Sequence, residues 1–205
     1  QKTTLLDFPG KVACTVFLAG CNFRCPFCQN AEILDGSPDE VAEEEFFAFL
    51  ERRRGILDGV CVSGGEPLVG DVAPFLRRIR ALGYAVKLDT NGAFPDKLKA
   101  LAAEGLIDFV AMDIKSSPAR YPALAGVKCD VQKIKESAAF LLEGSLPYEF
   151  RTTCVKPLHR PEVIASVAAT ENYAGGQSVP VQFTISPVTV AAPSLTGDDA
   201  TYSGA

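Results

Sequence analysis

Short apolar segments alternate along this chain with segments of helical period, and this alternation most restricts what the chain can fold into. The strand-like segments lie at residues 12–19, 58–62, 85–89, 107–114, 148–155 and 179–185. Between them, apolar residues recur at spacings of three and four, which predicts helices at residues 38–53, 72–82, 96–104, from 130 onward, and 161–170. Strands and helices that alternate in this way form a parallel sheet with helical crossover connections.

Polar residues and glycines mark where several of these helices begin and end. Residues 37–40 resemble a capping box with a proline at the first helical position. Asp71 and Asp130 stand where helices start, and Gly83 and Gly105 are typical of the position just after a helix. We expect the segment rich in Ser, Pro and Tyr after the fourth strand to be a loop.

Six repeats of strand and helix predict an α/β fold. Right-handed crossovers would curl them into a partial (β/α)6 TIM-like barrel, and a doubly wound sheet is the alternative. Both architectures place functional side chains at the carboxyl ends of the strands. We expect one domain at residues 1–186, followed by a loosely structured C-terminal tail at residues 187–205.

Composition argues against several classes of protein. The net charge of −5 disfavours a nucleic-acid-binding surface, which needs a basic face. No apolar run approaches the ~20 residues that span a bilayer, and no secretory signal is evident. Cysteines number seven, an odd count that fits a disulfide framework poorly and favours a reducing compartment. We therefore expect a cytoplasmic protein with neither a membrane nor a nucleic acid as partner.

Three of the cysteines, Cys21, Cys25 and Cys28, lie close together directly after the first strand. Their thiolates are the soft ligands that iron–sulfur clusters need. Since no fourth cysteine lies nearby, a [4Fe–4S] cluster held here would keep one iron without a protein ligand. A catalytic metal site needs such an open position. The alternative is a zinc site, whose fourth ligand would be missing because the single histidine, His159, lies on another element.

Polar residues follow the second strand. Ser63, Gly64, Gly65 and Glu66 combine a carboxylate with two glycines, which let a backbone approach a ligand closely. The same segment is equally typical of a tight turn. The segment therefore predicts a ligand contact only when it is considered together with the cysteine loop.

Charged residues lie near the ends of the third and fourth strands. Alternation along a strand puts Lys87 and Asp89 on one face, and Asp113 and Lys115 repeat the pattern. Charges inside a barrel are costly unless they are paired or bind a ligand. We expect Asp89, Asp113 and Lys115 to contact a ligand, whereas Lys87 either does so or pairs with Asp113.

The remaining notable polar and sulfur-containing residues allow fewer conclusions. Arg151 lies in the fifth strand, where it contacts the ligand or pairs with an acid such as Glu149. Cys14, Cys61 and Cys154 fall inside predicted strands, and we expect them to be buried core thiols. His159 is expected to lie in a surface loop.

The cysteine loop resembles the signature of the radical SAM superfamily, in which three such cysteines hold a [4Fe–4S] cluster. The resemblance implies that S-adenosylmethionine (SAM) binds the open iron and is cleaved reductively to a 5′-deoxyadenosyl radical. It also implies that Phe27, before the third cysteine, flanks the adenine. By the same resemblance, the segment from Gly64 to Glu66 holds the SAM amino group.

The later strand ends narrow the resemblance. Residues 89–92 and 113–115 resemble the glycyl-radical-enzyme activases, such as pyruvate formate-lyase activating enzyme. Residues 2–11 through 151–153 are similar to the anaerobic ribonucleoside-triphosphate reductase activating proteins. This implies that the third and fourth strands hold the methionyl end of SAM, with a monovalent cation beside Asp89, Thr90 and Asp113. The predicted cofactor-binding residues are Phe27, Ser63, Gly64, Gly65, Glu66, Lys87, Asp89, Asn91, Asp113, Lys115 and Arg151.

The same resemblance implies partners. A glycyl-radical enzyme would be the protein substrate, and a flavodoxin- or ferredoxin-type protein would donate the electron. One departure is Gln29, which cannot titrate and stands where relatives often carry a histidine. The sequence shows no ferredoxin-type cysteine insertion, so we expect a single cluster. The alternatives are a radical SAM reaction on a peptide or small molecule, and an electron carrier that binds no SAM.

Overall fold

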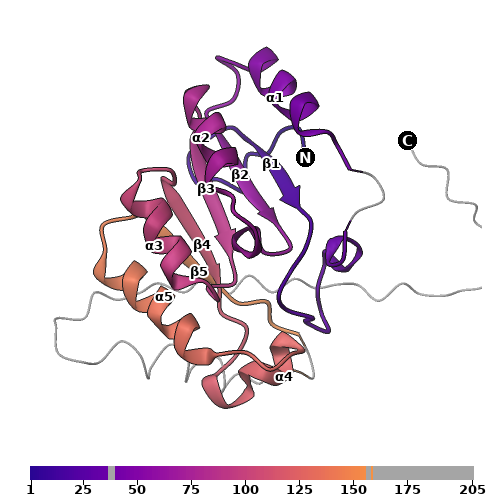
Figure 1. Cartoon of the computed structure of the whole chain (residues 1–205), viewed down its shortest axis with the longest axis vertical. Helices are drawn as coiled ribbons and strands as arrows, with labels where there is room; N and C mark the ends of the chain where they lie inside the picture. The colour runs from indigo at the N-terminus through magenta and orange to yellow at the C-terminus, as the bar shows by residue number, and fades with distance from the viewer. Residues whose placement is uncertain (37–39, 156–157, 159–205) are drawn as a thin grey trace, which may run out of the picture.

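Five parallel strands form one sheet in the computed structural model, which describes residues 1–36, 40–155 and 158. The strands are β1 (Ala13–Leu18), β2 (Gly59–Gly64), β3 (Ala85–Thr90), β4 (Phe109–Asp113) and β5 (Tyr148–Arg151) (Figure 1). Their order in the sheet is their order in the chain, and each pairs in parallel with the next. This order confirms the partial barrel, because in a doubly wound sheet the order of the strands reverses part-way across the sheet while the strands stay parallel.

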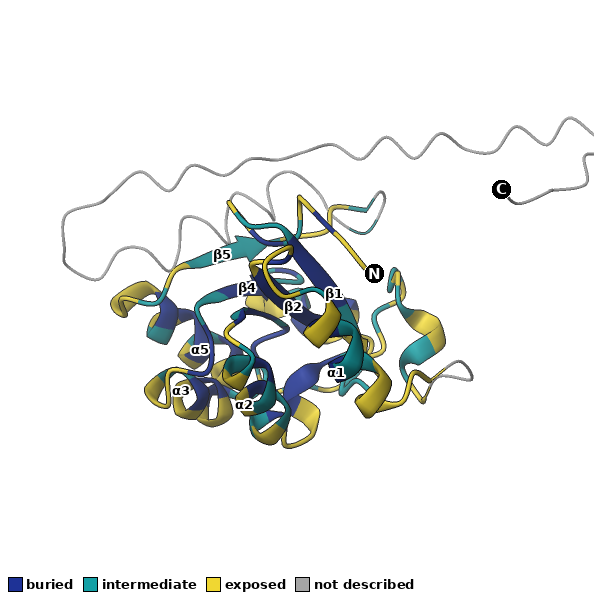
Figure 2. Ribbon diagram, turned by 90° about the horizontal axis from the view of Figure 1, so that it is seen from above, coloured by how far each residue is buried: buried dark blue, intermediate teal, exposed yellow. Residues whose placement is uncertain are grey.

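Helices cover one face of this sheet, as Figure 2 shows from above. They are α1 (Glu43–Arg52), α2 (Ala73–Ala81), α3 (Pro95–Ala103) and α5 (Val131–Glu143). Shorter helical turns lie in the connections: η1 (Ala31–Ile33), η2 (Pro67–Val69), η3 (Pro118–Arg120) and α4 (Tyr121–Ala125). The last two occupy the segment after the fourth strand that we expected to be a loop. That expectation was wrong, because Tyr121 and Leu124 are buried and hold the segment in a helical turn.

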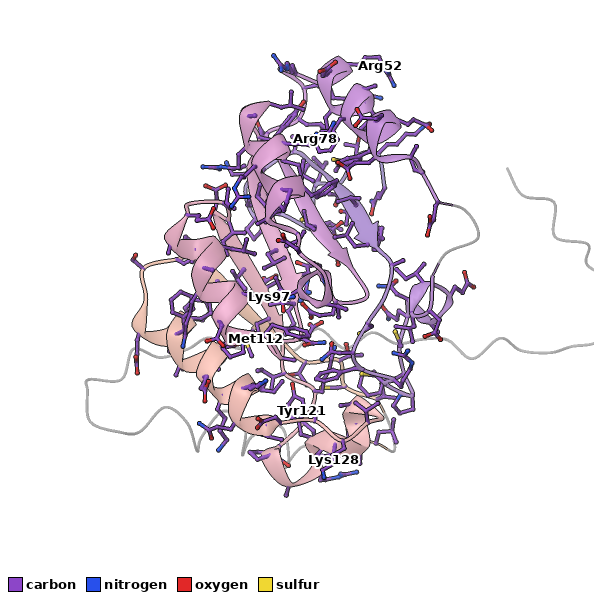
Figure 3. All side chains as sticks on the ribbon, in the orientation of Figure 1. Arg52, Arg78, Lys97, Met112, Tyr121 and Lys128 are labelled. Atoms are coloured by element: carbon purple, nitrogen blue, oxygen red, sulfur yellow. The ribbon has the colours of Figure 1, made fainter. Side chains whose placement is uncertain are left out.

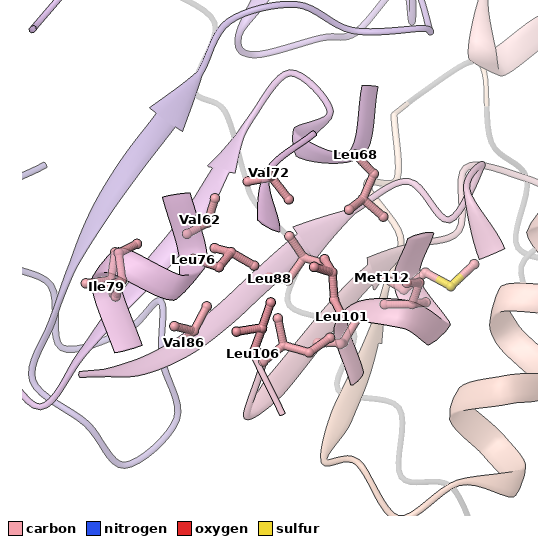
Figure 4. Packing of buried hydrophobic residues seen from close by; sticks show 14 of the residues in the cluster. Val62, Leu68, Val72, Leu76, Ile79, Val86, Leu88, Leu101, Leu106 and Met112 are labelled. Carbon is pink, nitrogen blue, oxygen red and sulfur yellow. The ribbon is translucent and has the colours of Figure 1, made fainter. Parts of the chain in front are cut away.

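The main core lies between the sheet and these helices. Val62, Val86 and Leu88 point from the strands toward Leu76 and Ile79 of α2 (Figure 4), and all five are fully buried. Alternation along a strand sends the neighbouring residues to the opposite face. Because the crossover helices cover one face of the sheet, the polar and charged side chains of the strands lie on the other face.

On the opposite face, the N-terminal residues close over the start of the strands. Phe8, Ala13 and Cys61 form a second, smaller buried cluster. Asp7 ties this segment to the sheet, since its carboxylate accepts a hydrogen bond from the Thr15 hydroxyl at 2.6 Å. Its carbonyl oxygen accepts one from the Cys61 thiol at 3.2 Å. Burial raises the pKa of Cys61 to about 12, as expected for a buried core thiol.

Most of the expected helix ends are confirmed. The Asp71 carboxylate accepts a hydrogen bond from the Ala73 N–H at 3.2 Å. Asp130 caps α5 in the same way, accepting from the Gln132 N–H at 3.0 Å. Gly83 follows α2 in the left-handed conformation, with φ of 88°, which a residue with a side chain rarely adopts.

Three expectations were wrong. Helix α1 begins at Glu43, because residues 40–42 are not helical and Ala42 is extended without a side-chain cap. Three glutamates fill its first turn, where negative charge favours the helix N-terminus. Strand β5 ends at Arg151, whose carbonyl accepts the last ladder hydrogen bond, from the Ile114 N–H. Cys154 therefore lies beyond the strand and is exposed rather than buried.

Several expectations lie outside the described residues. These are the capping residue Ser37, His159, the helix at residues 161–170, the strand at 179–185 and the tail at 187–205. Within the described part of the chain, the helices are too short or too polar to cross a membrane.

Truncating a core residue between sheet and helices should destabilise the fold. Leu88→Ala removes a fully buried side chain and should lower the free energy of unfolding by about 2–5 kcal/mol. Leu6→Ala, at a residue that is 90% exposed, should change it by less than about 0.5 kcal/mol. Urea unfolding followed by circular dichroism measures both values. Equal destabilisation by the two substitutions would contradict the assigned core.

Candidate active site

A pocket of about 520 Å³ lies at the carboxyl ends of the strands. It brings together most of the residues that the sequence predicted: Cys21, Cys25, Phe27, Cys28, Ser63, Gly64, Gly65, Asp89, Thr90, Asn91, Asp113, Lys115 and Arg151. Glu66 and Lys87 do not line the pocket, and both are buried beside it. Seven further lining residues were not among the predicted site residues: Phe17, Phe23, Gln29, Asn30, Leu34, Thr152 and Thr153.

The cysteine loop has no helix or strand of its own over residues 19–30 and is held by other elements. Phe23 is 2% exposed and packs edge-on against Tyr121 of α4, with ring centroids 6.4 Å apart. The backbone N–H of Arg24 donates to the Ala125 carbonyl at 2.8 Å. Tyr121, labelled in Figure 3, thus joins the loop to the segment that follows β4.

The three thiols suit a cluster better than a single ion. Among the described residues, no three His, Cys, Asp or Glu side chains converge closely enough to hold one metal ion. In an iron–sulfur cubane each thiolate binds a different iron, so its cysteines need not converge on one point. Burial raises the pKa of both Cys21 and Cys25. Cluster binding would therefore release protons from these thiols.

The two glycines at the end of β2, Gly64 and Gly65, have a packing role that the sequence did not reveal. A Cβ on Gly65 would lie 2.0 Å from the Gly20 carbonyl oxygen, and one on Gly64 would lie 2.3 Å from that of Leu18. The next backbone N–H, of Glu66, donates to the Gly20 oxygen at 2.9 Å. The glycines line the pocket, but they also let the β2 turn pack against the base of the cysteine loop.

Glu66 lies beneath the pocket as a buried acceptor. Its carboxylate accepts hydrogen bonds from the Asn91 N–H at 2.6 Å, the Thr90 hydroxyl at 2.9 Å and the Leu68 N–H at 3.1 Å. Burial raises its pKa to about 7, and these three donors oppose the rise. In this structure Glu66 orders the turn after β3, and direct contact with the SAM amino group stays a prediction.

Charged side chains form a continuous ladder across β3, β4 and β5. Arg151 Nε lies 3.2 Å from Asp113, and its Nη2 lies 3.3 Å from Asp89. Lys115 pairs with the other oxygen of Asp113 at 3.2 Å. Lys87 is buried and pairs with Asp89 at 2.6 Å and Glu149 at 3.6 Å. Lys87 therefore forms internal ion pairs, the alternative that we considered, but its partners are Asp89 and Glu149 rather than Asp113.

The ion pairs of this ladder keep Arg151 charged, and they occupy the carboxylates predicted to bind a monovalent cation. Burial disfavours the charged guanidinium, but the neighbouring carboxylates of Asp113, Asp89 and Glu149 outweigh it and raise the pKa of Arg151. All four carboxylate oxygens of Asp89 and Asp113 contact Lys or Arg, and the Thr90 hydroxyl points to Glu66. A monovalent cation would have to displace one of these groups, and it stays a prediction.

Comparison with known proteins decides the family. Residues 15–165 match the model of the Radical SAM superfamily. The chain belongs to the radical SAM superfamily. This radical SAM protein is also 30% identical, over 171 residues, to a Methanocaldococcus jannaschii protein named as a candidate glycyl-radical enzyme activating enzyme. That alignment covers 80% of this chain and 70% of the relative.

Other similarities are shorter or confined to the fold. The 7-carboxy-7-deazaguanine synthase of Rhodospirillum rubrum is 36% identical over 86 residues, 42% of this chain and 36% of the synthase. Streptococcus suis SuiB bound to its precursor peptide SuiA has a TM-score of 0.59 at 17% identity, over 76% of this chain and 35% of SuiB. Native anSMEcpe with bound AdoMet has a TM-score of 0.53 at 17% identity, over 67% of this chain and 42% of that protein. These structures support the partial-barrel fold.

Membership implies a [4Fe–4S] cluster and SAM, and the residues of this radical SAM protein fit both groups. Three soft thiol ligands lie on one loop of one pocket, beside strand ends that carry both carboxylates and cations. Asn22, between the first two cysteines, and Asn30, two residues after the third, were not among the predicted site residues. Their signal there was an amide side chain within two residues of a predicted cluster ligand.

Substituting the second glycine should disturb cluster binding. Gly65→Ala places a methyl group against the Gly20 carbonyl and should displace the base of the cysteine loop. The matched control is Gly70→Ala, where a Cβ would meet nothing within 4 Å. We expect iron and sulfide content after anaerobic reconstitution to fall at least severalfold in Gly65→Ala only. Wild-type content in Gly65→Ala would contradict the packing assigned to this turn.

The raised pKa of Glu66 should make stability depend on pH. A carboxyl group with a folded pKa near 7 and an unfolded value near 4.5 binds its proton more tightly in the folded state. Its contribution to stability is therefore fully present below about pH 4.5 and is lost as the pH rises through about 7.

The variant Glu66→Gln cannot ionise at this position. Its stability therefore lacks this pH dependence, and the difference between wild type and variant gives the contribution of Glu66. Between pH 4.5 and 8, the free energy of unfolding of the wild type relative to Glu66→Gln should fall by up to about 3 kcal/mol. Anaerobic urea unfolding across this range measures the difference. A difference that stays constant with pH would show that Glu66 titrates normally.

Proposed function

We propose that this radical SAM enzyme installs a glycyl radical on a partner enzyme of the anaerobic ribonucleotide reductase type. The observation that carries the proposal is the 30% identity to the Methanocaldococcus jannaschii protein over 80% of this chain. The similarity to the deazaguanine synthase of Rhodospirillum rubrum, in contrast, covers only 42% of the chain. The Asp-Thr-Asn-Gly and Asp-Ile-Lys segments support the same assignment.

In this proposal, the three cysteines hold the cluster and the strand ends hold SAM. When bound, the cluster supplies the electron that cleaves SAM, whose adenosyl carbon then abstracts a hydrogen atom from the substrate. The methionyl group of SAM carries an ammonium and a carboxylate. Asp89 and Asp113 suit the ammonium, while Lys115 and Arg151 suit the carboxylate, since opposite charges within a few ångströms attract strongly where water is partly excluded. Phe27 offers an apolar surface for the adenine.

The volume of the pocket supports a macromolecular substrate that enters it only in part. Its volume of about 520 Å³ is in the range that one small ligand fills. A cluster and SAM together would occupy most of this space. The reacting carbon of a substrate would then approach from the rim, where Phe17 lines the pocket and is 46% exposed. A glycine in a protruding loop suits this approach because it has no side chain.

A second candidate is a radical SAM reaction on a small molecule. It is favoured by the identity to several 7-carboxy-7-deazaguanine synthases, which reaches 36% over short stretches. It uses the same cluster and the same SAM site but a different third component. The electron donor in either case is proposed to be a flavodoxin- or ferredoxin-type protein, and the cytoplasm the place of action.

Electron paramagnetic resonance of the partner tests the proposal. The reduced enzyme, SAM and the glycyl-radical enzyme encoded in the same genome are incubated without oxygen. We expect a glycyl radical signal on the partner, with 5′-deoxyadenosine formed in proportion to it. Cys25→Ala, which removes one cluster ligand, should produce neither.

Two results would overturn the proposal. One is SAM cleavage without any glycyl signal on the partner. The other is transfer of hydrogen label from a non-protein metabolite into 5′-deoxyadenosine, which would favour the second candidate.

A further inference from the structure

Residues 90–92, the end of β3 and the turn that follows, are held by hydrogen bonds to buried side chains. Glu66 accepts hydrogen bonds from both the Thr90 hydroxyl and the Asn91 N–H. The hydroxyl of Ser137 on α5, which is fully buried, donates to the Gly92 carbonyl at 2.8 Å. A Cβ on Gly92 would lie 2.2 Å from the methyl carbon of Met112. Hydrogen bonds and close packing therefore fix the position of this segment at the edge of the pocket.

Asn91 connects this rigid turn to the cysteine loop. Its side-chain N–H donates to the side-chain oxygen Oδ1 of Asn22 at 2.8 Å, across 69 positions of sequence. The amide cannot turn over freely, because its own oxygen accepts a hydrogen bond from the Ala93 N–H at 3.0 Å. Asn91 is 5% exposed, so water competes little for this contact. Asn22 directly follows the first cysteine of the loop.

A second asparagine ties the other side of the loop. The Asn30 side chain, two residues after Cys28, donates to the Gly64 carbonyl at 2.9 Å. The two contacts lie directly after Cys21 and two residues after Cys28, and they attach the loop to the ends of β3 and β2. Both strand ends also line the pocket. Since the loop lacks regular structure of its own, its position follows that of the strand ends.

We propose that Asn22 and Asn91 are positioning residues for SAM binding. Their hydrogen bond holds the loop that carries the cluster in register with the strand end that faces the nucleotide. A cluster can still assemble without this bond, because the three thiols are unchanged. SAM, however, must contact the cluster and the strand ends together, so its affinity depends on their relative position. The inference rests on family membership and not on the identity of the partner.

The test compares Asn22→Ala, Asn91→Ala and the double variant after anaerobic reconstitution. Iron and sulfide content reports cluster assembly, and SAM titration of the reduced cluster by electron paramagnetic resonance reports affinity. We expect wild-type cluster content and about 5- to 10-fold weaker SAM binding in each single variant, the size expected for one lost hydrogen bond. The double variant should bind SAM as weakly as either single one, because both substitutions break the same contact.

Two further variants separate positioning from general destabilisation. Asn22→Asp keeps an acceptor oxygen toward Asn91 and should restore most of the affinity lost in Asn22→Ala. Glu32→Ala, at an exposed position on η1, should match the wild type. Three results would overturn the proposal: wild-type SAM affinity in both alanine variants, effects that multiply in the double variant, or loss of cluster content that accounts for the whole change in binding.

Discussion

The backbone of the turn at the end of β2 packs directly against Gly20 at the start of the cysteine loop, with no room for a side chain between them. A Cβ on Gly65 would come within 2.0 Å of the Gly20 carbonyl oxygen. This contact places a loop without regular structure against the carboxyl edge of a rigid sheet. Phe23 then packs against Tyr121, and Asn22 and Asn30 reach the ends of β3 and β2. The cysteines thus share a pocket with strand ends distant in sequence.

The charged ladder shows how the sheet tolerates ionised groups on its inner face. The strand register puts the small side chain of Ala111 between Asp89 on β3 and Glu149 on β5. Lys87 reaches both acids, and Arg151 spans Asp89 and Asp113. Within this ladder each charge has a partner of opposite sign, which offsets the cost of removing it from water. A zwitterionic ligand can exchange for such pairs without leaving an isolated charge.

Some of this organisation was predictable from the sequence, and the reasons differ between elements. The βα alternation and the rule that parallel strands share one carboxyl edge were enough to bring Cys21, Asp89, Asp113 and Arg151 together. The start of α1 was missed because a strong capping pattern at residues 37–40 competes with three glutamates that favour a later start. The end of β5 was missed because an apolar run does not reveal where its ladder partner stops.

Contacts between side chains from distant elements were not predictable. One partner of Lys87, Asp89, lies on its own strand, but the second, Glu149, depends on the register of β3, β4 and β5, which no local pattern encodes. Asn22 and Asn91 are 69 positions apart, and each is an ordinary loop residue when considered alone. The two glycines at the end of β2 were recognised in the sequence. The close contact of Gly65 with Gly20 could be seen only in the folded structure.

The central claim is that three thiols of one loop hold an iron–sulfur cluster with one iron open to SAM. Its most direct test is electron paramagnetic resonance of the anaerobically reconstituted, reduced protein, recorded before and after SAM is added. The account predicts a [4Fe–4S] signal whose shape changes on addition of SAM and is absent in Cys21→Ala. A protein that binds zinc in place of iron, or a cluster signal that does not respond to SAM, would contradict it.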